Sequence, residues 1–146
     1  MIGGNYTSKS KYDQAIEFYK QALAIRREIK DKAGELETLI ALGDAYNINA
    51  LNYNQRGLYA QAKPEFSRLI EIAQETLTLA RELKNPDSEA QALTHLGSAY
   101  IFFKDYPKAE ASLQEAVRIA RQIKELQTET TALSNLALIY NASRFF

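Results

Sequence analysis

The chain has 146 residues, and its eighteen Lys and Arg balance its eighteen Asp and Glu, so the formal net charge is zero. This balance argues against the basic field that attracts nucleic acid or anionic lipid. The absence of cysteine excludes disulfide bridges, thiol catalysis and zinc sites with thiolate ligands. No apolar run approaches the roughly 20 residues of a membrane helix, so we expect a cytoplasmic protein with no membrane partner.

Apolar residues recur at spacings of three and four along nearly the whole chain, which is typical of amphipathic helices. Residues 1–10 are predicted to be a flexible leader, and Gly3-Gly4 is not interpreted as a phosphate loop because no strand precedes it. The first helix is expected over residues 11–31, with Ser10 and Asp13 as a weak capping signal.

The next two helices are expected to form one hairpin over residues 32–85, with Gly34 marking the turn before it. Gly57-Leu58-Tyr59 looks like the turn between its two helices. About seven extra residues lie on each side of this turn, so the hairpin should project by roughly 10 Å beyond its neighbours. Pro64 should lie inside the second helix and kink it, because proline lacks the backbone donor.

An apolar stripe should continue through both helices of this hairpin. Its predicted members are Tyr46, Ala50 and Tyr53 in the first helix, and Tyr59, Ala62, Phe66, Leu69, Ile70, Ala73 and Leu77 in the second.

Stronger start signals mark the helices that follow. Asn85-Pro86-Asp87 offers an N-cap, a first-turn proline and an acidic residue near the positive helix end, and Asp105-Tyr106-Pro107 does the same twenty residues later. Residues 86–126 should therefore form a second helix pair. Residues 127–146 should form one more helix, whose apolar residues include Leu136, Leu138, Ile139, Tyr140, Phe145 and Phe146.

These elements repeat. Residues 22–46, 76–100 and 116–140 align without a gap, and so do the eleven residues before each, so the unit is a helix, a turn and a second helix. Two motifs, Leu39-x2-Leu42-Gly43-x2-Tyr46 and Leu93-x2-Leu96-Gly97-x2-Tyr100, resemble the first-helix signature of tetratricopeptide repeats, and Ala15-x3-Tyr19 and Ala109-x3-Leu113 resemble that of the second. The 40 residues from Tyr100 to Tyr140 resemble the longer repeats of kinesin light chains and bacterial signalling proteins.

The resemblance implies an all-α fold, a right-handed superhelical stack of antiparallel helix pairs with about six helices and one lengthened hairpin. Residues 11–31 and 127–146 would be the second and first helices of truncated repeats. Leu39, Leu93 and Leu133 stand where the family often has Trp, and Ala137 replaces Gly in the last copy. Gly43 and Gly97 should let a neighbouring helix approach closely.

Catalytic, metal and cofactor sites are not predicted. The chain has one histidine and lacks a Gly-x-Ser-x-Gly or phosphate-loop pattern. His95 should be hydrogen-bonded or exposed beside the packing face. The basic cluster around Arg26-Arg27 is explained by the negative end of a helix better than by nucleic acid.

In the family, the first helices line the concave surface, and this registration predicts the partner-binding residues. They are Glu37, Ile40, Asp44, Asn47, Gln91, Thr94, Ser98, Ile101, Thr131, Ser134, Leu138 and Asn141. Asn135 matches an asparagine that recurs in kinesin-light-chain-like members. The face is polar, mildly acidic at one end and free of Lys and Arg, so a carboxylate clamp is not expected. These residues should have no folding role, and the alternative that they are merely solvated stays open.

The predicted function is a non-enzymatic scaffold that binds a peptide or protein segment on the concave face, as part of a larger regulatory protein. The alternative is a self-assembly element that forms a homo-oligomer through uncapped ends of the stack. The hairpin around Tyr53, Leu58 and Tyr59 is a second candidate surface for a partner.

Overall fold

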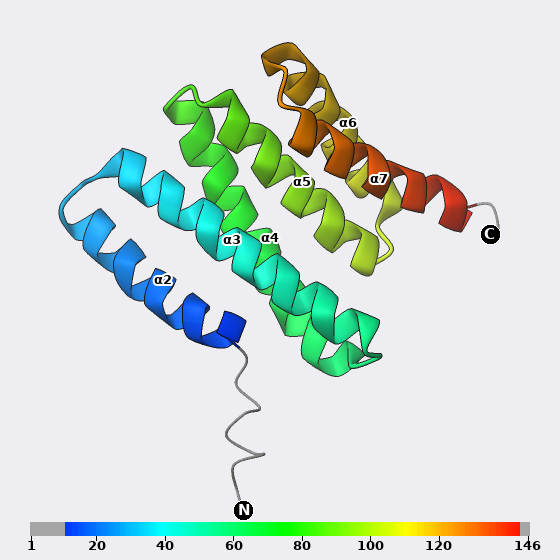
Figure 1. The fold of residues 1–146 in the computed structure, drawn as a ribbon, viewed down its shortest axis with the longest axis horizontal. Helices are drawn as coiled ribbons and strands as arrows, with labels where there is room; N and C mark the ends of the chain where they lie inside the picture. Colours follow the sequence, from blue (N-terminus) through cyan, green and yellow to red (C-terminus); the bar gives the residue numbers. More distant parts are fainter. Residues whose placement is uncertain (1–10, 144–146) are drawn as a thin grey trace, which may run out of the picture.

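The structure is a computed structural model that describes residues 11–143, and every secondary-structure element in that range is an α-helix. The helices are α2 (Lys11–Glu28), α3 (Lys32–Gln55), α4 (Tyr59–Glu82), α5 (Pro86–Phe102), α6 (Tyr106–Ile123) and α7 (Leu126–Ser143). Each helix runs antiparallel to the next, and the pairs stack side by side (Figure 1). The predicted all-α stack of six helices is confirmed. The predicted leader, the Ser10 cap and the terminal Phe145 and Phe146 lie outside the described residues.

Side-chain caps begin α3, α5 and α6. Asp31 accepts a hydrogen bond from the backbone N–H of Gly34 at 2.9 Å, and Asn85 accepts one from Ser88 at 3.0 Å. Asp105 accepts one from Lys108 at 3.4 Å. The predicted caps at Asn85 and Asp105 are therefore confirmed. Gly34 does not lie in the loop between α2 and α3, as the sequence predicted, but in the first helical turn of α3. A Cβ atom there would clash with the side chains of Asp31 and Arg26.

The short turns themselves use lysine. The backbone reverses through one left-handed residue after each of four helices, with φ between 54° and 61° at Lys30, Lys84, Lys104 and Lys124. Glycine is the usual residue in this conformation. Because lysine takes its place here, the sequence does not indicate which residue of each turn is left-handed. Only the longer hairpin uses glycine there, at Gly57 with φ of 75°.

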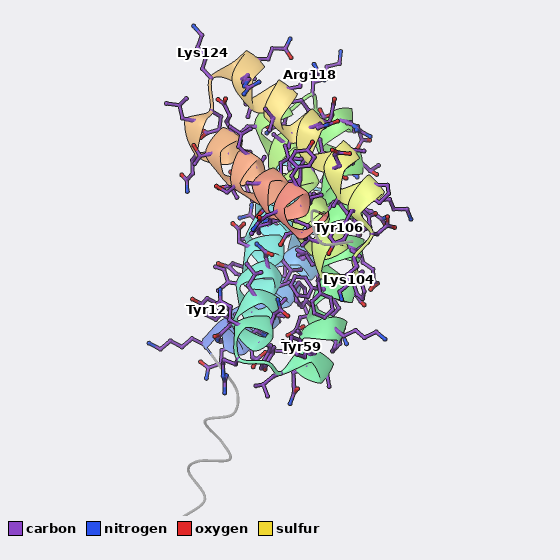
Figure 2. All side chains as sticks on the ribbon, turned by 90° about the vertical axis from the view of Figure 1, so that its right-hand side faces the viewer. Tyr12, Tyr59, Lys104, Tyr106, Arg118 and Lys124 are labelled. Atoms are coloured by element: carbon purple, nitrogen blue, oxygen red, sulfur yellow. The ribbon has the colours of Figure 1, made fainter. Side chains whose placement is uncertain are left out.

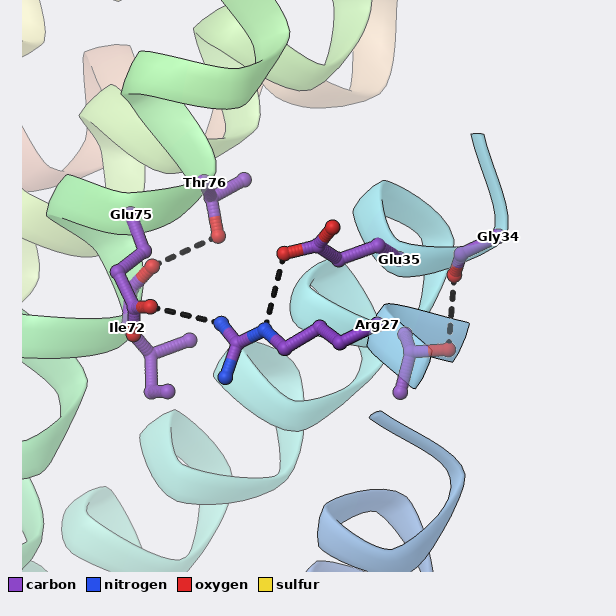
Figure 3. Close-up of polar contacts among 7 residues, drawn as sticks. Arg27, Gly34, Glu35, Ile72, Glu75 and Thr76 are labelled. Atoms are coloured by element: carbon purple, nitrogen blue, oxygen red, sulfur yellow. Dashed lines mark hydrogen bonds and ion pairs between the residues drawn. The ribbon is translucent and has the colours of Figure 1, made fainter. Parts of the chain in front are cut away.

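An ion pair between residues eight apart in sequence spans three of these turns. Arg27 contacts Glu35 at 3.0 Å, and the same pairing recurs as Arg81 with Glu89 at 3.0 Å and Arg121 with Glu129 at 2.7 Å. Arg27 also contacts Glu75 of α4 at 2.7 Å (Figure 3). The hydrogen bond from Arg27 to Glu35 is the main reason that the pKa of Arg27 is raised. Arg26 pairs with Asp31 at 2.5 Å, so both arginines of the predicted basic cluster form ion pairs within the chain.

The core consists of two apolar clusters between first and second helices, and the partly buried Ile70 packs against both. The predicted stripe is buried as expected at Tyr46, Ala50, Ala62, Phe66, Leu69 and Ala73. The prediction that Tyr59 belongs to this buried stripe is wrong, because its side chain is 61% exposed. Tyr59 is the first residue of α4, at the tip of the hairpin of α3 and α4 (Figure 2).

The hairpin of α3 and α4 is lengthened as predicted. Both helices have 24 residues, whereas the other described helices have 17 or 18. Six or seven extra residues correspond to about 10 Å of helix, and the joined ends of α3 and α4 extend past the end of α5 (Figure 1). Helix α4 continues through Pro64, and the kink there stays a prediction.

A buried polar cluster joins the first three helices near this extension. The amide of Asn49 in α3 is buried, and it donates to Asp13 of α2 at 3.0 Å and to Glu65 of α4 at 2.7 Å. Burial raises the pKa of Glu65, the Asn49 hydrogen bond lowers it, and the nearby charge of Asp13 raises it further, with a net rise. The cluster therefore provides the hydrogen bonds that buried polar groups require.

Gly43 and Gly97 lie at close contacts between neighbouring helices. A Cβ atom on Gly97 would clash with the buried side chain of Leu113 in α6. A Cβ atom on Gly43 would lie 2.9 Å from Nδ1 of His95 in α5. Both glycines therefore permit close packing, although the approaching group is a side chain and not the partner's backbone.

We predict that Gly97→Leu lowers the free energy of unfolding by at least about 3 kcal/mol, the upper end of the usual overpacking range. Leu113 is completely buried in the core, so a larger side chain at position 97 must displace packed residues. Ala137→Leu is the matched control, because Ala137 occupies the equivalent repeat position on α7 and is exposed. That variant should change stability by less than about 0.5 kcal/mol. Equal effects in urea denaturation would contradict the packing role.

We also predict that Glu65 makes stability depend on pH. A carboxyl with a raised pKa in the folded state binds its proton more tightly there, so its stabilising contribution is present at low pH and is lost as pH rises through the folded pKa. The free energy of unfolding of the parent, relative to Glu65→Gln, should thus fall from about pH 4 upward. Urea midpoints across a pH series measure this difference. Glu71→Gln, at an exposed position of the same helix, is the control, and a difference independent of pH would refute the prediction.

Candidate functional site

The first helices of the repeats form one side of the stack. The backbones of α3 and α5, and of α5 and α7, approach each other closely, whereas those of α2, α4 and α6 do not within the described residues. The long side chain of Arg27 in α2 does reach α4, at Glu75. Helices that meet on one side and separate on the other curve the stack, so the side formed by α3, α5 and α7 is concave. These three helices lie side by side in Figure 1, with α4 and α6 behind them.

A polar hollow of about 300 Å³ lies on this side. Carboxylates of Asp44, Asp87 and Glu125 line it, and no Lys or Arg is among its lining residues in the described part of the chain. The remaining lining residues are Asn47, Gln91, Thr94, His95, Ser98, Gln127, Thr128, Thr131 and Asn135. The lining of this hollow therefore carries negative charge, although the net charge of the chain is zero.

A second hollow, of about 720 Å³, lies next to the lengthened hairpin. Large apolar side chains line much of it, and Lys104 is its one lysine or arginine among the described residues. Phe66 of α4 and Phe102 of α5 stack in its wall with ring centroids 4.4 Å apart. Its lining residues are Asn47, Leu51, Asn54, Tyr59, Phe66, Ser98, Ile101, Phe102, Lys104, Thr131, Asn135 and Leu138.

The two hollows adjoin each other. Four polar residues, Asn47, Ser98, Thr131 and Asn135, line both. We call the combined surface the groove, with an acidic half at the polar hollow and an apolar half at the lengthened hairpin.

The groove brings together most of the residues predicted from sequence. Those that line it are Asp44, Asn47, Gln91, Thr94, Ser98, Ile101, Thr131, Asn135 and Leu138. Glu37, Ile40, Ser134 and Asn141 belong to the same helices but line neither hollow. That any of these residues binds a partner stays a prediction.

Two hydrogen bonds across the groove give some of these residues a role in folding. Nε2 of the buried His95 lies 2.9 Å from Oδ1 of Asp44, and Ser98 Oγ donates to Asn47 Oδ1 at 3.0 Å. Both bonds tie α5 to α3. The expectation of a hydrogen-bonded His95 is confirmed, but the expectation that Asp44 and Ser98 have no folding role is wrong. In each bond the two residues are 51 apart in sequence and lie on different helices. A helical wheel considers one helix at a time, so it cannot show such a bond.

Sequence reasoning missed several lining residues. Asp87 and Glu125 were not assigned to the groove, although both lie where a first helix begins and so at its rim. Leu51, Phe102 and Lys104 were also missed, because they line the groove only where α3 and α4 extend past α5. The adjacent aromatic residues Phe102-Phe103 at the end of α5 were the one available signal.

Within residues 11–143, His, Asp and Glu side chains form no group of three or more that could hold a metal ion. The helices of that part of the chain also include none with the length and apolar character needed to cross a membrane.

Comparison with known families gives two matches. Residues 45–122, more than half of the chain, match a family model described as tetratricopeptide repeat, and residues 2–33 match a second model with the same description. The second match includes residues assigned to the leader, where Ile2-Gly3 precedes Tyr6 at the spacing that separates Leu96-Gly97 from Tyr100. Comparison with curated proteins gives no match.

Proposed function

Because the chain belongs to the tetratricopeptide-repeat family, whose repeats generally mediate interactions between proteins, we propose that it is a scaffold that binds a peptide or protein segment in the groove. The observation that carries this proposal is that α3, α5 and α7 each line both adjoining hollows, which gives an extended segment room to lie along these three helices.

Polar side chains that line the groove suit a peptide backbone. Among the described residues, the side chains of Gln91, Thr131 and Asn135 have no hydrogen-bond partner, and all three line the groove. An amide side chain both donates and accepts, so it can pair with the N–H and C=O groups of an extended segment whatever the sequence of that segment.

We predict that Gln91→Lys combined with Thr131→Lys weakens peptide binding at least tenfold. Peptides would first be selected on the parent protein from a random display library, and affinities then measured by fluorescence anisotropy. The added side chains obstruct the groove from α5 and α7, while stability should change by less than about 0.5 kcal/mol per site. Gln14→Lys with Gln21→Lys is the control, since it adds equal charge at exposed positions of α2 outside the groove. Equal affinity in both double variants would refute groove binding.

A second candidate function, self-assembly, is favoured by one observation about α2 and α7. Ile25 of α2 is 58% exposed, whereas its repeat equivalents Leu79 and Ile119 are 6% and 4% exposed. Those equivalents pack against the first helix of their own repeat, and α2 has no such helix among the described residues.

Helix α7 presents the complementary surface. Leu133 is 40% exposed, whereas its equivalents Leu39 and Leu93, which pack against second helices, are 1% and 5% exposed. Contact of α7 in one copy with α2 in another would therefore recreate the helix pair that the chain already contains twice. Such a head-to-tail interface leaves one surface open at each end, so it extends into chains of molecules.

We predict that Leu133→Asp and Ile25→Asp each abolish self-association, and that their equimolar mixture forms dimers only. Each variant retains one intact surface, so the mixture can make a single junction. Sedimentation velocity at micromolar concentrations measures the outcome, with a monomer mass of 16.5 kDa. A monomeric parent, or a mixture that stays monomeric, would exclude this assembly.

A further inference from the structure

We infer that the groove selects a peptide with a large apolar side chain about three residues from a basic side chain. This inference rests on the proposed function and adds the chemistry of the partner. It depends on the two halves of the groove, on the distance between them and on the placement of charges along it.

The apolar half exists because α3 and α4 extend past α5. Phe102, at the end of α5, packs against Phe66 of α4 and closes one side of the hollow. Leu51 from α3 and Leu138 from α7 are exposed in its lining, with Leu138 at 55%. A hollow of about 720 Å³ falls within the roughly 300–1,000 Å³ range of ligand pockets. Covering these side chains with an aromatic or branched apolar residue removes apolar surface from water, which is favourable.

Charge distinguishes the acidic half from the apolar half. The three lining carboxylates are Asp44, Asp87 and Glu125, and Asp44 remains half-exposed although it pairs with His95. The lining of this half contains no Lys or Arg within the described chain. Lys104 lies in the lining of the other half. A basic side chain therefore fits the acidic half by charge complementarity, and it would meet Lys104 if the segment were shifted toward the hairpin.

The spacing follows from helix geometry. Asp44 and Leu51 lie seven residues apart on α3, which is about 10 Å along the helix at 1.5 Å per residue. An extended peptide advances about 3.3 Å per residue. One segment therefore reaches both halves when its basic and apolar side chains are about three residues apart, while Asn47, which lines both halves, faces the backbone between them.

The absence of tryptophan from the chain allows a direct test. The probe is the acetylated and amidated peptide Gly-Ser-Lys-Ser-Ser-Trp-Ser-Gly, together with the same peptide in which Lys and Trp are exchanged. Two comparison peptides replace Lys by Glu or place Lys and Trp next to each other. Selective excitation of tryptophan reports binding through a blue shift of its emission.

We expect the better of the two probe orders to bind at least tenfold more tightly than either comparison peptide, and to weaken as salt rises past about 0.15 M. Leu138→Asp should reduce its affinity at least tenfold and remove the blue shift. Leu126→Asp is the matched control, because it makes the same change at a 72% exposed position of the same helix outside the groove, and it should leave affinity unchanged.

Two results would overturn the inference and leave the proposed function intact. The first is equal affinity for the Lys and Glu peptides. The second is equal affinity of the Leu138→Asp and Leu126→Asp proteins for the probe, while display-selected peptides still depend on Gln91 and Thr131. If no peptide binding depends on any groove residue, the proposed function fails together with the inference.

Discussion

Close packing of each first helix against the second helix of its own repeat determines the rest of this structure. Gly97 lies directly beneath Leu113, and Ala109 and Ala116 of the same second helix are completely buried. Small residues at these positions let α5 and α6 approach until their apolar stripes are removed from water. The first helices also contact one another, so the stack has a concave side.

In the lengthened hairpin, α3 and α4 pack against each other in the same way over a greater length, and a hollow lies beside them on the concave side. Ala50 and Ala62 continue the buried stripe into the extension, where the adjacent α5 has already ended. The extension must bury the polar Asn49, and hydrogen bonds to Asp13 and Glu65 satisfy that amide. Leu51 and Tyr59 of the extension are exposed, and both line the apolar half of the groove.

Charges are segregated although their sum is zero. Arginines concentrate at the turns, where Arg27, Arg81 and Arg121 each pair with a glutamate of the next helix. These pairs are exposed, so each contributes little to stability, and none of the three arginines lines the acidic half of the groove. The carboxylates at the groove are therefore not neutralised by lysine or arginine within the described lining of the acidic half.

The sequence by itself determined the helices, the caps of α5 and α6, the repeat register and the lengthened hairpin, because helical periodicity and capping depend on residues within one or two turns of each other. It also placed Thr131 and Asn135 on the concave side through registration. Only the tertiary structure decided that Tyr59 is exposed and that Asp44 supports His95. It alone revealed the apolar half of the groove. These features arise where helices of unequal length meet, and the groups concerned are far apart in sequence, so no local pattern encodes the contact between them.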